Sequence, residues 1–216
     1  MKDKKKSKSN FMYFFTKRLF DIFVGLIGLI VLIPLIIIIK LVSICNGDFN
    51  SIFFAQNRIG KDGKEFKFYK FRSMVPNADE VLFKMLKENK EIAKEYKINK
   101  KLKDDPRITK IGKILRRTSI DELPQLLNVL KGDMSLIGNR PYLPREKKDM
   151  GEYFGEIVKT KPGITGYWQV SGREDVTFEN RLKLESFYSN NYSLSLDIKI
   201  FFKTFKAVFG GHGAAE

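Results

Sequence analysis

Cysteine and histidine are nearly absent from this chain of 216 residues. Because Cys45 is the only cysteine, neither an intrachain disulfide nor a cluster of thiolate metal ligands can form, which fits a reducing compartment. His212, the only histidine, lies in a glycine-rich tail. Acid–base or nucleophilic chemistry must therefore use carboxylates, lysines or hydroxyls rather than imidazole.

Several motifs of common nucleotide and metal enzymes are also missing. The chain has no Walker A loop, no dinucleotide-binding glycine fingerprint and no HExxH zinc motif. It also lacks the Asp-x-Asp pair that many metal-dependent glycosyltransferases use to hold a nucleotide sugar.

Acidic residues are scarce relative to basic ones. The chain has 25 Asp and Glu against 40 Lys and Arg, a formal net charge of +15. The expected partners are therefore anionic: nucleic acid, acidic lipid head groups or substrates that carry phosphate. The lysines are spread along the whole chain, and the chain contains a candidate membrane anchor. We therefore expect no nucleic-acid partner.

That anchor is the longest uncharged run, Ile22 to Ile39, flanked by Asp21 and Lys40. Its length and hydropathy are typical of a membrane helix. A buried core helix is less favoured, because the run is apolar on all sides. A cleaved signal peptide is also less favoured, because the run is long and no small-residue cleavage site follows it.

The charges that flank the run predict its topology. Residues 1–18 are strongly basic, so the positive-inside rule places them in the cytoplasm. Lys40 and the basic, disulfide-free body beyond it also look cytoplasmic. A single straight span cannot put both ends on one side, whereas a helix broken near Pro34 could dip into the bilayer and return. A kinked full span, with the N-terminus outside, is the alternative.

The remaining pattern predicts an α+β, mostly helical domain. Two alternating runs around Lys61-Asp62-Gly63 predict a β-hairpin over Ser51 to Phe71. Asn77 to about Lys101 reads as one helix, with Asn77 and Glu80 as a box-like start. Leu196 to Phe209 is an amphipathic helix that can lie in the membrane interface, although simple core packing explains it equally well.

The densest group of chemically useful side chains lies between Arg116 and Pro141. Asp121 and Glu122 are adjacent carboxylates at the expected start of a short helix. A structural explanation exists, because acids favour helix starts and Ser119 with Glu122 matches a capping box. However, arginines flank the pair, and no histidine is available. Carboxylates beside arginines suit Mg²⁺-assisted phosphoryl transfer.

Taken in order, the motifs resemble those of the monotopic phosphoglycosyl transferases, a family of bacterial sugar transferases. The resemblance runs from about Phe15 to Ala214. It rests on the following segments: TKRLFD (16–21), the proline-containing apolar helix, QNRIG (56–60), YKFRSM (69–74), DDPRITKIGKILRRTSIDELPQLLNVLKGDMSLIGNRP (104–141) and KPGITGYWQVSGR (161–173).

The resemblance implies a reaction and a place in the cell. Such enzymes transfer a sugar 1-phosphate from a UDP-sugar to undecaprenyl phosphate, release UMP and start capsule, exopolysaccharide or O-antigen assembly. Asp121 matches the nucleophile, which forms a phosphosugar–aspartyl intermediate, and Glu122 matches its partner acid; both are the expected Mg²⁺ ligands. The expected location is the cytoplasmic face of the bacterial inner membrane, in contact with membrane lipids. Association into a homodimer is left open.

The matched motifs also suggest binding residues and a division of the chain. The residues expected to bind phosphate or nucleotide are Lys70, Arg72, Arg116, Arg140, Gln169 and Arg173, with surface ion pairing as the alternative for the cations. The expected regions are a basic N-terminus (1–18), a re-entrant anchor broken near Pro34 (19–45) and a cytoplasmic catalytic domain (46–216). The four-span region of longer family members is missing, so we expect a stand-alone catalytic form.

Three positions depart from the family pattern. Asn139 and Ile59 stand where proline is common, and Glu185 replaces a frequent aspartate. The segment Asn77 to Lys101 resembles members that transfer a hexose 1-phosphate, so galactose or glucose is the expected sugar. An N-acetylated or diamino sugar is the alternative. Two other functions compete: a non-catalytic scaffold that binds acidic lipids, and a direct glycosyltransferase that would release UDP.

Overall fold

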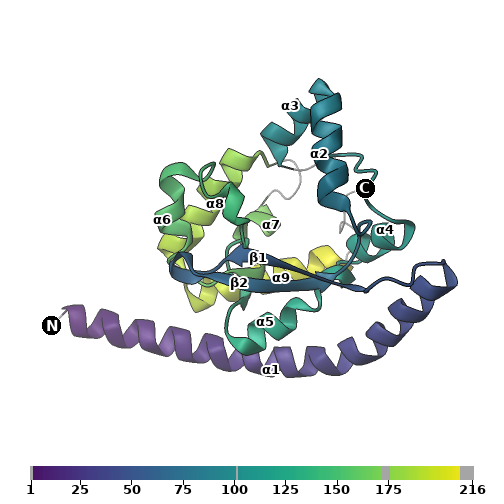
Figure 1. Ribbon diagram of the computed structural model, residues 1–216. Helices are drawn as coiled ribbons and strands as arrows, with labels where there is room; N and C mark the ends of the chain where they lie inside the picture. Colours follow the sequence, from purple (N-terminus) through teal and green to yellow (C-terminus); the bar gives the residue numbers. More distant parts are fainter. Residues whose placement is uncertain (1, 101, 172–175, 210–216) are drawn as a thin grey trace.

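The computed structural model describes residues 2–100, 102–171 and 176–209. They form a mostly helical chain with one long apolar helix and a small antiparallel sheet, as predicted (Figure 1). The elements are α1 (Lys2–Cys45), β1 (Phe53–Ile59), β2 (Glu65–Phe71), α2 (Ala78–Glu88), α3 (Lys90–Asn99), α4 (Lys110–Arg117), α5 (Gln125–Lys131), β3 (Ser135–Ile137), α6 (Phe154–Ile157), β4 (Gly163–Thr165), α7 (Tyr167–Ser171), α8 (Phe178–Asn191) and α9 (Leu194–Phe209).

Strands β1 and β2 form the predicted hairpin. Phe53 pairs with Phe71 and Ile59 with Glu65 across an antiparallel ladder. The turn falls at the predicted Lys61–Gly63, where Asp62 has φ 58° and Gly63 has φ 76°. Aspartate and glycine tolerate this left-handed backbone better than other residues, which is why the turn could be located from the sequence.

Helix α1 is apolar all round in sequence but one-sided in structure. Its buried positions in this run are spaced four or seven residues apart, at Asp21, Gly25, Leu32, Ile39 and Ser43. This spacing places them on one helical face, which packs on the rest of the chain. The opposite face is exposed and carries the side chains of Phe23, Ile27, Ile30, Ile33 and Ile37.

Two glycines bring α1 close to α5. A Cβ atom at Gly28 would lie 2.4 Å from Leu126 Cδ1, and one at Gly25 would lie 2.8 Å from Leu130 Cδ2. Leucine side chains of α5 therefore occupy the space that a larger α1 residue would fill. In Figure 1, α5 lies between α1 and the β1–β2 hairpin, whereas α2 and α3 project from the side away from α1.

The predicted break near Pro34 is not present in α1. The helix continues through Pro34 to Cys45 and is curved along the underside of the domain (Figure 1). Curvature accommodates the missing N–H of proline where the surrounding turns are held by packing. Among the described residues, α1 is the one helix long and apolar enough to cross a membrane, over Phe11–Cys45; its most apolar stretch of 18 residues has a mean hydropathy of 3.3.

Two helices, α2 and α3, take the place of the single helix that we predicted from Asn77 to about Lys101. Helix α2 ends at Glu88, and Asn89 takes an extended backbone conformation before α3 begins. The side chain of Asn89 accepts hydrogen bonds from the N–H groups of Glu91 and Ile92, whereas the side chain of Asn77 caps nothing. The helical spacing of apolar residues continues across Asn89, so the pattern did not indicate that this residue is an N-cap.

Strands β3 and β4 pair in parallel, and the backbone segments around them approach each other very closely. Ser135 pairs with Gly163 and Ile137 with Thr165. A Cβ atom at Gly163 would lie 2.1 Å from the main-chain nitrogen of Gly138, and one at Gly166 would lie 2.2 Å from the Gly138 oxygen. Only glycine fits so close to another backbone. Because the two strands are parallel, the segments that follow β3 and β4 leave from the same end of the pair.

Candidate functional site

Asp121 and Glu122 lie in a short 3₁₀ turn between α4 and α5. Ser119, with φ 56°, ends α4 and reverses the chain, so its side chain does not cap the following turn. The capping box that we considered for Ser119 and Glu122 is therefore not formed, and the helix itself begins later, at Gln125. Asp121 is buried and Glu122 is half-buried, so neither acid is a freely solvated helix-start residue.

Asn128 brings Lys70 to this pair. Its side chain is fully buried, accepts the Tyr69 N–H at 3.1 Å and donates to the Lys67 oxygen at 2.7 Å. These bonds fasten α5 to the edge of β2 in the manner of an additional strand. As a result, Lys70 Nζ lies 3.6 Å from Asp121 Oδ2, and the two side chains form a partly buried ion pair.

The electrostatic environment acts differently on the neighbouring groups. Burial, together with the adjacent Asp121 charge, raises the pKa of Glu122 to about 7, although Lys70, Arg140 and Arg116 oppose the shift. Burial also lowers the pKa of Lys70, against the attraction of Asp121. Two adjacent carboxylates close to several cations can receive a further cation or an anionic phosphate.

Arg116 is held beside the acids by a close contact between α4 and the segment after β2. Its Nε donates to Ser73 Oγ at 2.9 Å. Ser73 can lie so near because Gly112 has no side chain: a Cβ there would lie 1.9 Å from the Ser73 oxygen. Burial lowers the pKa of Arg116, and Asp121 partly offsets this shift.

A cleft of about 470 Å³, partly open to solvent, lies beside the acids and is lined by Glu122. Lys70, Glu122, Arg140 and Gln169 are among the residues that line it. Arg140 follows β3 and Gln169 lies on α7 after β4, so the parallel pairing of β3 with β4 brings them together. Trp168 also lines the cleft.

Of the predicted binding residues that the structure describes, Arg116 and Arg72 do not line this cleft. Arg72 donates to the carbonyl oxygens of Ser51 and Met74 and to Asp48 Oδ2, at 2.6, 3.2 and 2.8 Å. Its guanidinium therefore ties the chain after α1 to the end of β2. Arg173 lies outside the described residues.

Arg58 and Arg181 were not among the predicted binding residues. Arg58, from β1, lines the cleft, donates to the Pro141 oxygen at 3.0 Å and lies over the Phe68 ring. Burial and the nearby Arg140 lower the pKa of Arg58 to about 10. Arg181 lies over the ring of Trp168, 5.2 Å from its centroid. The motif QNRIG contains Arg58 and offered a signal, whereas nothing in the sequence singled out Arg181.

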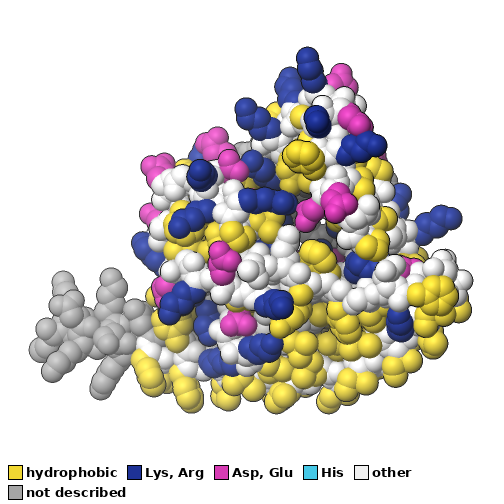
Figure 2. Space-filling view, in the orientation of Figure 1, with side chains coloured by type: hydrophobic (Ala, Val, Ile, Leu, Met, Phe, Trp, Pro, Cys, Tyr) yellow, Lys and Arg dark blue, Asp and Glu magenta, His cyan; other side chains and the backbone are white. Residues whose placement is uncertain are grey.

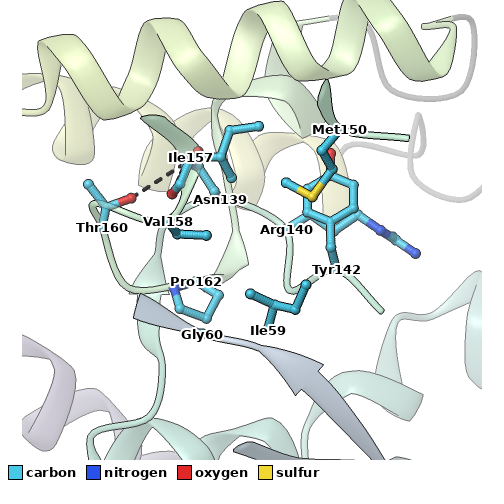
Figure 3. A pocket seen from close by; sticks show the side chains of 10 residues that line it. All are labelled: Ile59, Gly60, Asn139, Arg140, Tyr142, Met150, Ile157, Val158, Thr160 and Pro162. Carbon is cyan, nitrogen blue, oxygen red and sulfur yellow. Dashed lines mark hydrogen bonds between the residues drawn. The ribbon is translucent and has the colours of Figure 1, made fainter. Parts of the chain in front are cut away.

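Asn139, which departs from the family pattern, has a structural role beside the cleft. Its buried side chain donates to the Ile157 oxygen at 3.1 Å and to Ser189 Oγ at 2.6 Å. It also lies 3.4 Å from Thr160 Oγ1, the bond drawn in Figure 3. Proline could not make these bonds. Arg140 borders the same small pocket, but its guanidinium extends out of it (Figure 3).

Glu185 of α8, the other notable departure, is a fully buried carboxylate at 1% exposure. Its Oε1 accepts the main-chain N–H of Arg140 at 2.8 Å. Burial raises the pKa of Glu185 from an ordinary 4.5 to about 7, against the bond from Arg140 and the attraction of Arg181. The folded chain therefore keeps a proton there that the unfolded chain releases.

This shift predicts a pH-dependent gain in stability for Glu185→Gln. Between pH 4.5 and 7 the folded state binds more protons, so its free energy of unfolding falls as pH rises through this window and is flat above it. The variant removes that penalty and should gain about 3 kcal/mol at about pH 8. Denaturant unfolding should show little gain at about pH 4.5. An equal gain at both pH values would contradict this explanation.

A buried aspartate beside a lysine, a second acid and an arginine-lined cleft define a site for transfer chemistry on an anionic, phosphate-bearing substrate. Comparison with known proteins specifies the class. The model of the family described as bacterial sugar transferase matches residues 12–211.

Three relatives illustrate the similarity. The exopolysaccharide production protein ExoY of Sinorhizobium fredii is 41% identical over 92% of this chain and 88% of its own length. The UDP-galactose-lipid carrier transferase of Erwinia amylovora is 44% identical, over 93% of this chain and 42% of its own length. The undecaprenyl-phosphate galactose phosphotransferase of Salmonella typhimurium is 47% identical, over 77% of this chain and 35% of its own length. The chain thus spans less than half of the last two relatives.

The chain belongs to the bacterial sugar transferase family. The predicted resemblance is confirmed, and the protein is an enzyme of the phosphoglycosyl transferase class.

Proposed function

We propose that the enzyme transfers a sugar 1-phosphate, with galactose or glucose as the sugar, from its UDP-sugar to undecaprenyl phosphate and releases UMP. The observation that carries this proposal is the placement of Asp121 beside Lys70, which lines a cleft together with Glu122 and Arg140. The printed names of two relatives, a UDP-galactose-lipid carrier transferase and an undecaprenyl-phosphate galactose phosphotransferase, support the substrates.

In the first step, an Asp121 carboxylate oxygen attacks the phosphorus that bears the sugar. A bond forms between this oxygen and phosphorus, and the bridging phosphorus–oxygen bond to the nucleotide breaks. UMP leaves with the bonding electron pair. Lys70 lies 3.6 Å from the nucleophile, so its charge can stabilise the phosphoryl oxygens as they crowd around Asp121. No proton transfer is required in this step.

In the second step, a phosphate oxygen of undecaprenyl phosphate attacks the same phosphorus. The bond from phosphorus to Asp121 breaks, and the carboxylate is regenerated as the polyprenyl-diphosphate sugar leaves. Dividing a difficult transfer into two displacements through a carboxylate is an established strategy of covalent catalysis. Arg140 and Arg58 line the same cleft and are placed to hold the nucleotide phosphates.

The acids present fit the Mg²⁺ requirement of this proposal. Among the described residues, no three His, Cys, Asp or Glu side chains gather as a metal cage. Mg²⁺ usually binds through one or two carboxylates together with substrate phosphates and water, so Asp121 and Glu122 would hold it. When bound, the ion would neutralise charge on the phosphate oxygens. The raised pKa of Glu122 accords with a carboxylate that gains from a cationic neighbour.

We further propose that α1 makes the enzyme monotopic, with both ends of the apolar run on the cytoplasmic side. At its N-terminal end, Tyr13 and Lys17 bond Asp197 of α9 at 2.9 and 2.6 Å. At its C-terminal end, Lys40 donates to the carbonyl oxygens of Phe49 and Asn50. A straight span would carry one end about 27 Å away, at 1.5 Å per residue, and would break one set of contacts.

The exposed face of α1 then becomes the membrane-facing surface. Hydrophobic side chains cover this edge of the molecule, while most visible charges lie above it (Figure 2). Helix α9 extends the surface: Phe201 contacts Phe20 of α1 with ring centroids 5.6 Å apart, and Ile198 and Phe202 are exposed. Such a surface would hold Asp121 near an acceptor phosphate that is fixed at the bilayer.

This topology predicts that reporters fused to the N-terminus and to the C-terminus both read as cytoplasmic. The expectation rests on the attachment of both ends of the apolar run to one domain. Paired fusions that are active only in the cytoplasm or only outside it would measure each end separately. An N-terminal reporter on the outer side would exclude the monotopic arrangement.

The nucleotide product tests the proposed reaction. Purified enzyme with Mg²⁺, undecaprenyl phosphate and a panel of UDP-sugars should release UMP, fastest with UDP-galactose or UDP-glucose. Fastest release with an N-acetylated or diamino UDP-sugar would keep the reaction and correct the sugar. UDP as product would indicate a direct glycosyltransferase. Salt-sensitive liposome binding without any nucleotide release would indicate a lipid-binding scaffold.

A further inference from the structure

Behind the cleft, the structure contains a group of buried polar atoms that lack hydrogen-bond partners. They are Arg140 Nε and Arg181 Nε, whereas Tyr142 Oη and Glu185 Oε2, which also lack a hydrogen bond of normal geometry, interact with each other. Arg181 and Glu185 are four residues apart and therefore share a face of α8. Buried polar atoms are rarely left unpaired, and each such case calls for an explanation. The mechanism proposed above uses Arg140 but gives no role to Glu185.

The bond that Glu185 does make is unusual for a carboxylate beside two arginines. Its Oε1 accepts the main-chain N–H of Arg140 at 2.8 Å. Within the described part of the chain, it forms no ion pair with the guanidinium of Arg140 or of Arg181. A carboxylate that bound the guanidinium in two places would satisfy it and hold it back from a ligand.

The position of Arg140 explains why such an arrangement would be useful. Arg140 lies just beyond β3, and its side chain lines the same cleft as Lys70 and Glu122. Its Nε is buried and unpartnered. A guanidinium in this state is available to a phosphate that enters the cleft, provided that its main chain is fixed.

We propose that Glu185 is a positioning residue: by accepting the main-chain N–H of Arg140, it fixes this residue and leaves the guanidinium uncommitted for a nucleotide phosphate. The proposal rests on the proposed function, because it takes UDP as the ligand of the cleft. It separates two properties of Glu185. The acceptor oxygen positions Arg140, whereas the negative charge is not required for this role.

Variants of Glu185 can distinguish the acceptor oxygen from the negative charge. Glu185→Leu removes the acceptor at similar volume and should weaken UDP binding about tenfold, which corresponds to the loss of one buried hydrogen bond. Glu185→Gln keeps a carbonyl oxygen and should restore affinity to within about threefold. Glu156→Leu is the matched control: Glu156 accepts bonds from Ser186 and Asn190 of α8 but does not contact Arg140, so affinity should stay within about twofold.

The decisive readout is a double-mutant cycle with Arg140→Ala, measured as the Kd of UDP by calorimetry on the full-length chain in detergent. If Glu185 acts through Arg140, Glu185→Leu should cause no further loss in the Arg140→Ala background. A tenfold loss that persists there would overturn the proposal, because it would show a general structural effect. Equal damage by Gln and Leu would also overturn it, because the charge would then matter instead of the acceptor.

Two further outcomes are informative. If Glu185→Leu fails to fold, Glu185→Asp, whose shorter carboxylate cannot reach Arg140 as closely, should weaken UDP binding several-fold, again only while Arg140 is present. A wild-type chain that does not bind UDP would refute the proposed function itself. A wild-type chain that binds UDP through Arg140 but is indifferent to Glu185→Leu would refute this inference alone.

Discussion

Asp121→Asn is expected to slow the release of UMP from UDP-galactose by about 10³-fold or more, the scale seen when an enzyme loses its nucleophile. The amide has nearly the shape of the carboxylate but is a far weaker nucleophile. Because Asp121 is buried against Lys70, the substitution also removes the partner of that cation. The variant should still fold, and its UDP affinity should be close to that of the wild type. Initial rates of UMP release would measure the effect.

Two other acids serve as comparisons for this variant. Glu122→Gln changes the adjacent acid and should lower the rate by a smaller factor, about 10²-fold, if Glu122 acts by holding Mg²⁺. Asp79→Asn changes an exposed aspartate that lies 3.8 Å from Arg145, and should stay within about twofold, since exposed ion pairs contribute little. Near-normal turnover by Asp121→Asn would show that the nucleophile is another group.

Gly163→Ala is expected to destabilise the chain by about 3 kcal/mol or more, the upper end of overpacking effects. The new Cβ would lie 2.1 Å from Gly138 N and 2.5 Å from the Thr165 oxygen. Both are backbone atoms, so β3 and β4 would have to separate. Arg140 and Gln169 follow these strands and line the cleft, so the cleft would be distorted as stability is lost.

The control for this variant is Gly155→Ala. Gly155 lies in α6, and a Cβ atom there would meet nothing within 4 Å. Alanine is favoured over glycine in helices by up to about 1 kcal/mol, so stability should be equal or slightly higher. Thermal unfolding in detergent, with UMP release measured at low temperature, would compare the two variants. Equal melting temperatures for both variants would show that β3 and β4 can separate more easily than the short backbone distances at Gly163 imply.

The parts of the fold and site that the sequence predicted carry local signals. The turn at Lys61–Gly63 contains residues that tolerate a left-handed backbone, and the hairpin followed from it. Asp121 and Glu122 could be singled out because histidine is nearly absent and arginines surround the pair. The grouping of Lys70 with Arg140 came only through the family motifs, since residues so far apart in sequence share a cleft through tertiary packing.

The parts that the sequence did not predict depend on contacts between distant segments. The buried face of α1 could not be predicted, because the run is apolar on every side. The role of its glycines depends on their contact with the leucines of α5. Arg72 has the same charge as Lys70, and two residues apart in a strand would put both side chains on one face. However, β2 ends at Phe71, so Arg72 lies beyond the strand and its side chain binds Asp48 instead. Nothing in local sequence separates these two roles.

The central claim is that Asp121 carries the sugar phosphate between donor and acceptor, and trapping of this intermediate tests it most directly. Wild-type enzyme incubated with Mg²⁺ and UDP-galactose, but without undecaprenyl phosphate, should release about one equivalent of UMP. Peptide mass spectrometry should then find one hexose phosphate on Asp121, and the adduct should disappear when undecaprenyl phosphate is added. An unmodified Asp121, with UMP released only when donor and acceptor are both present, would contradict the account and indicate direct transfer.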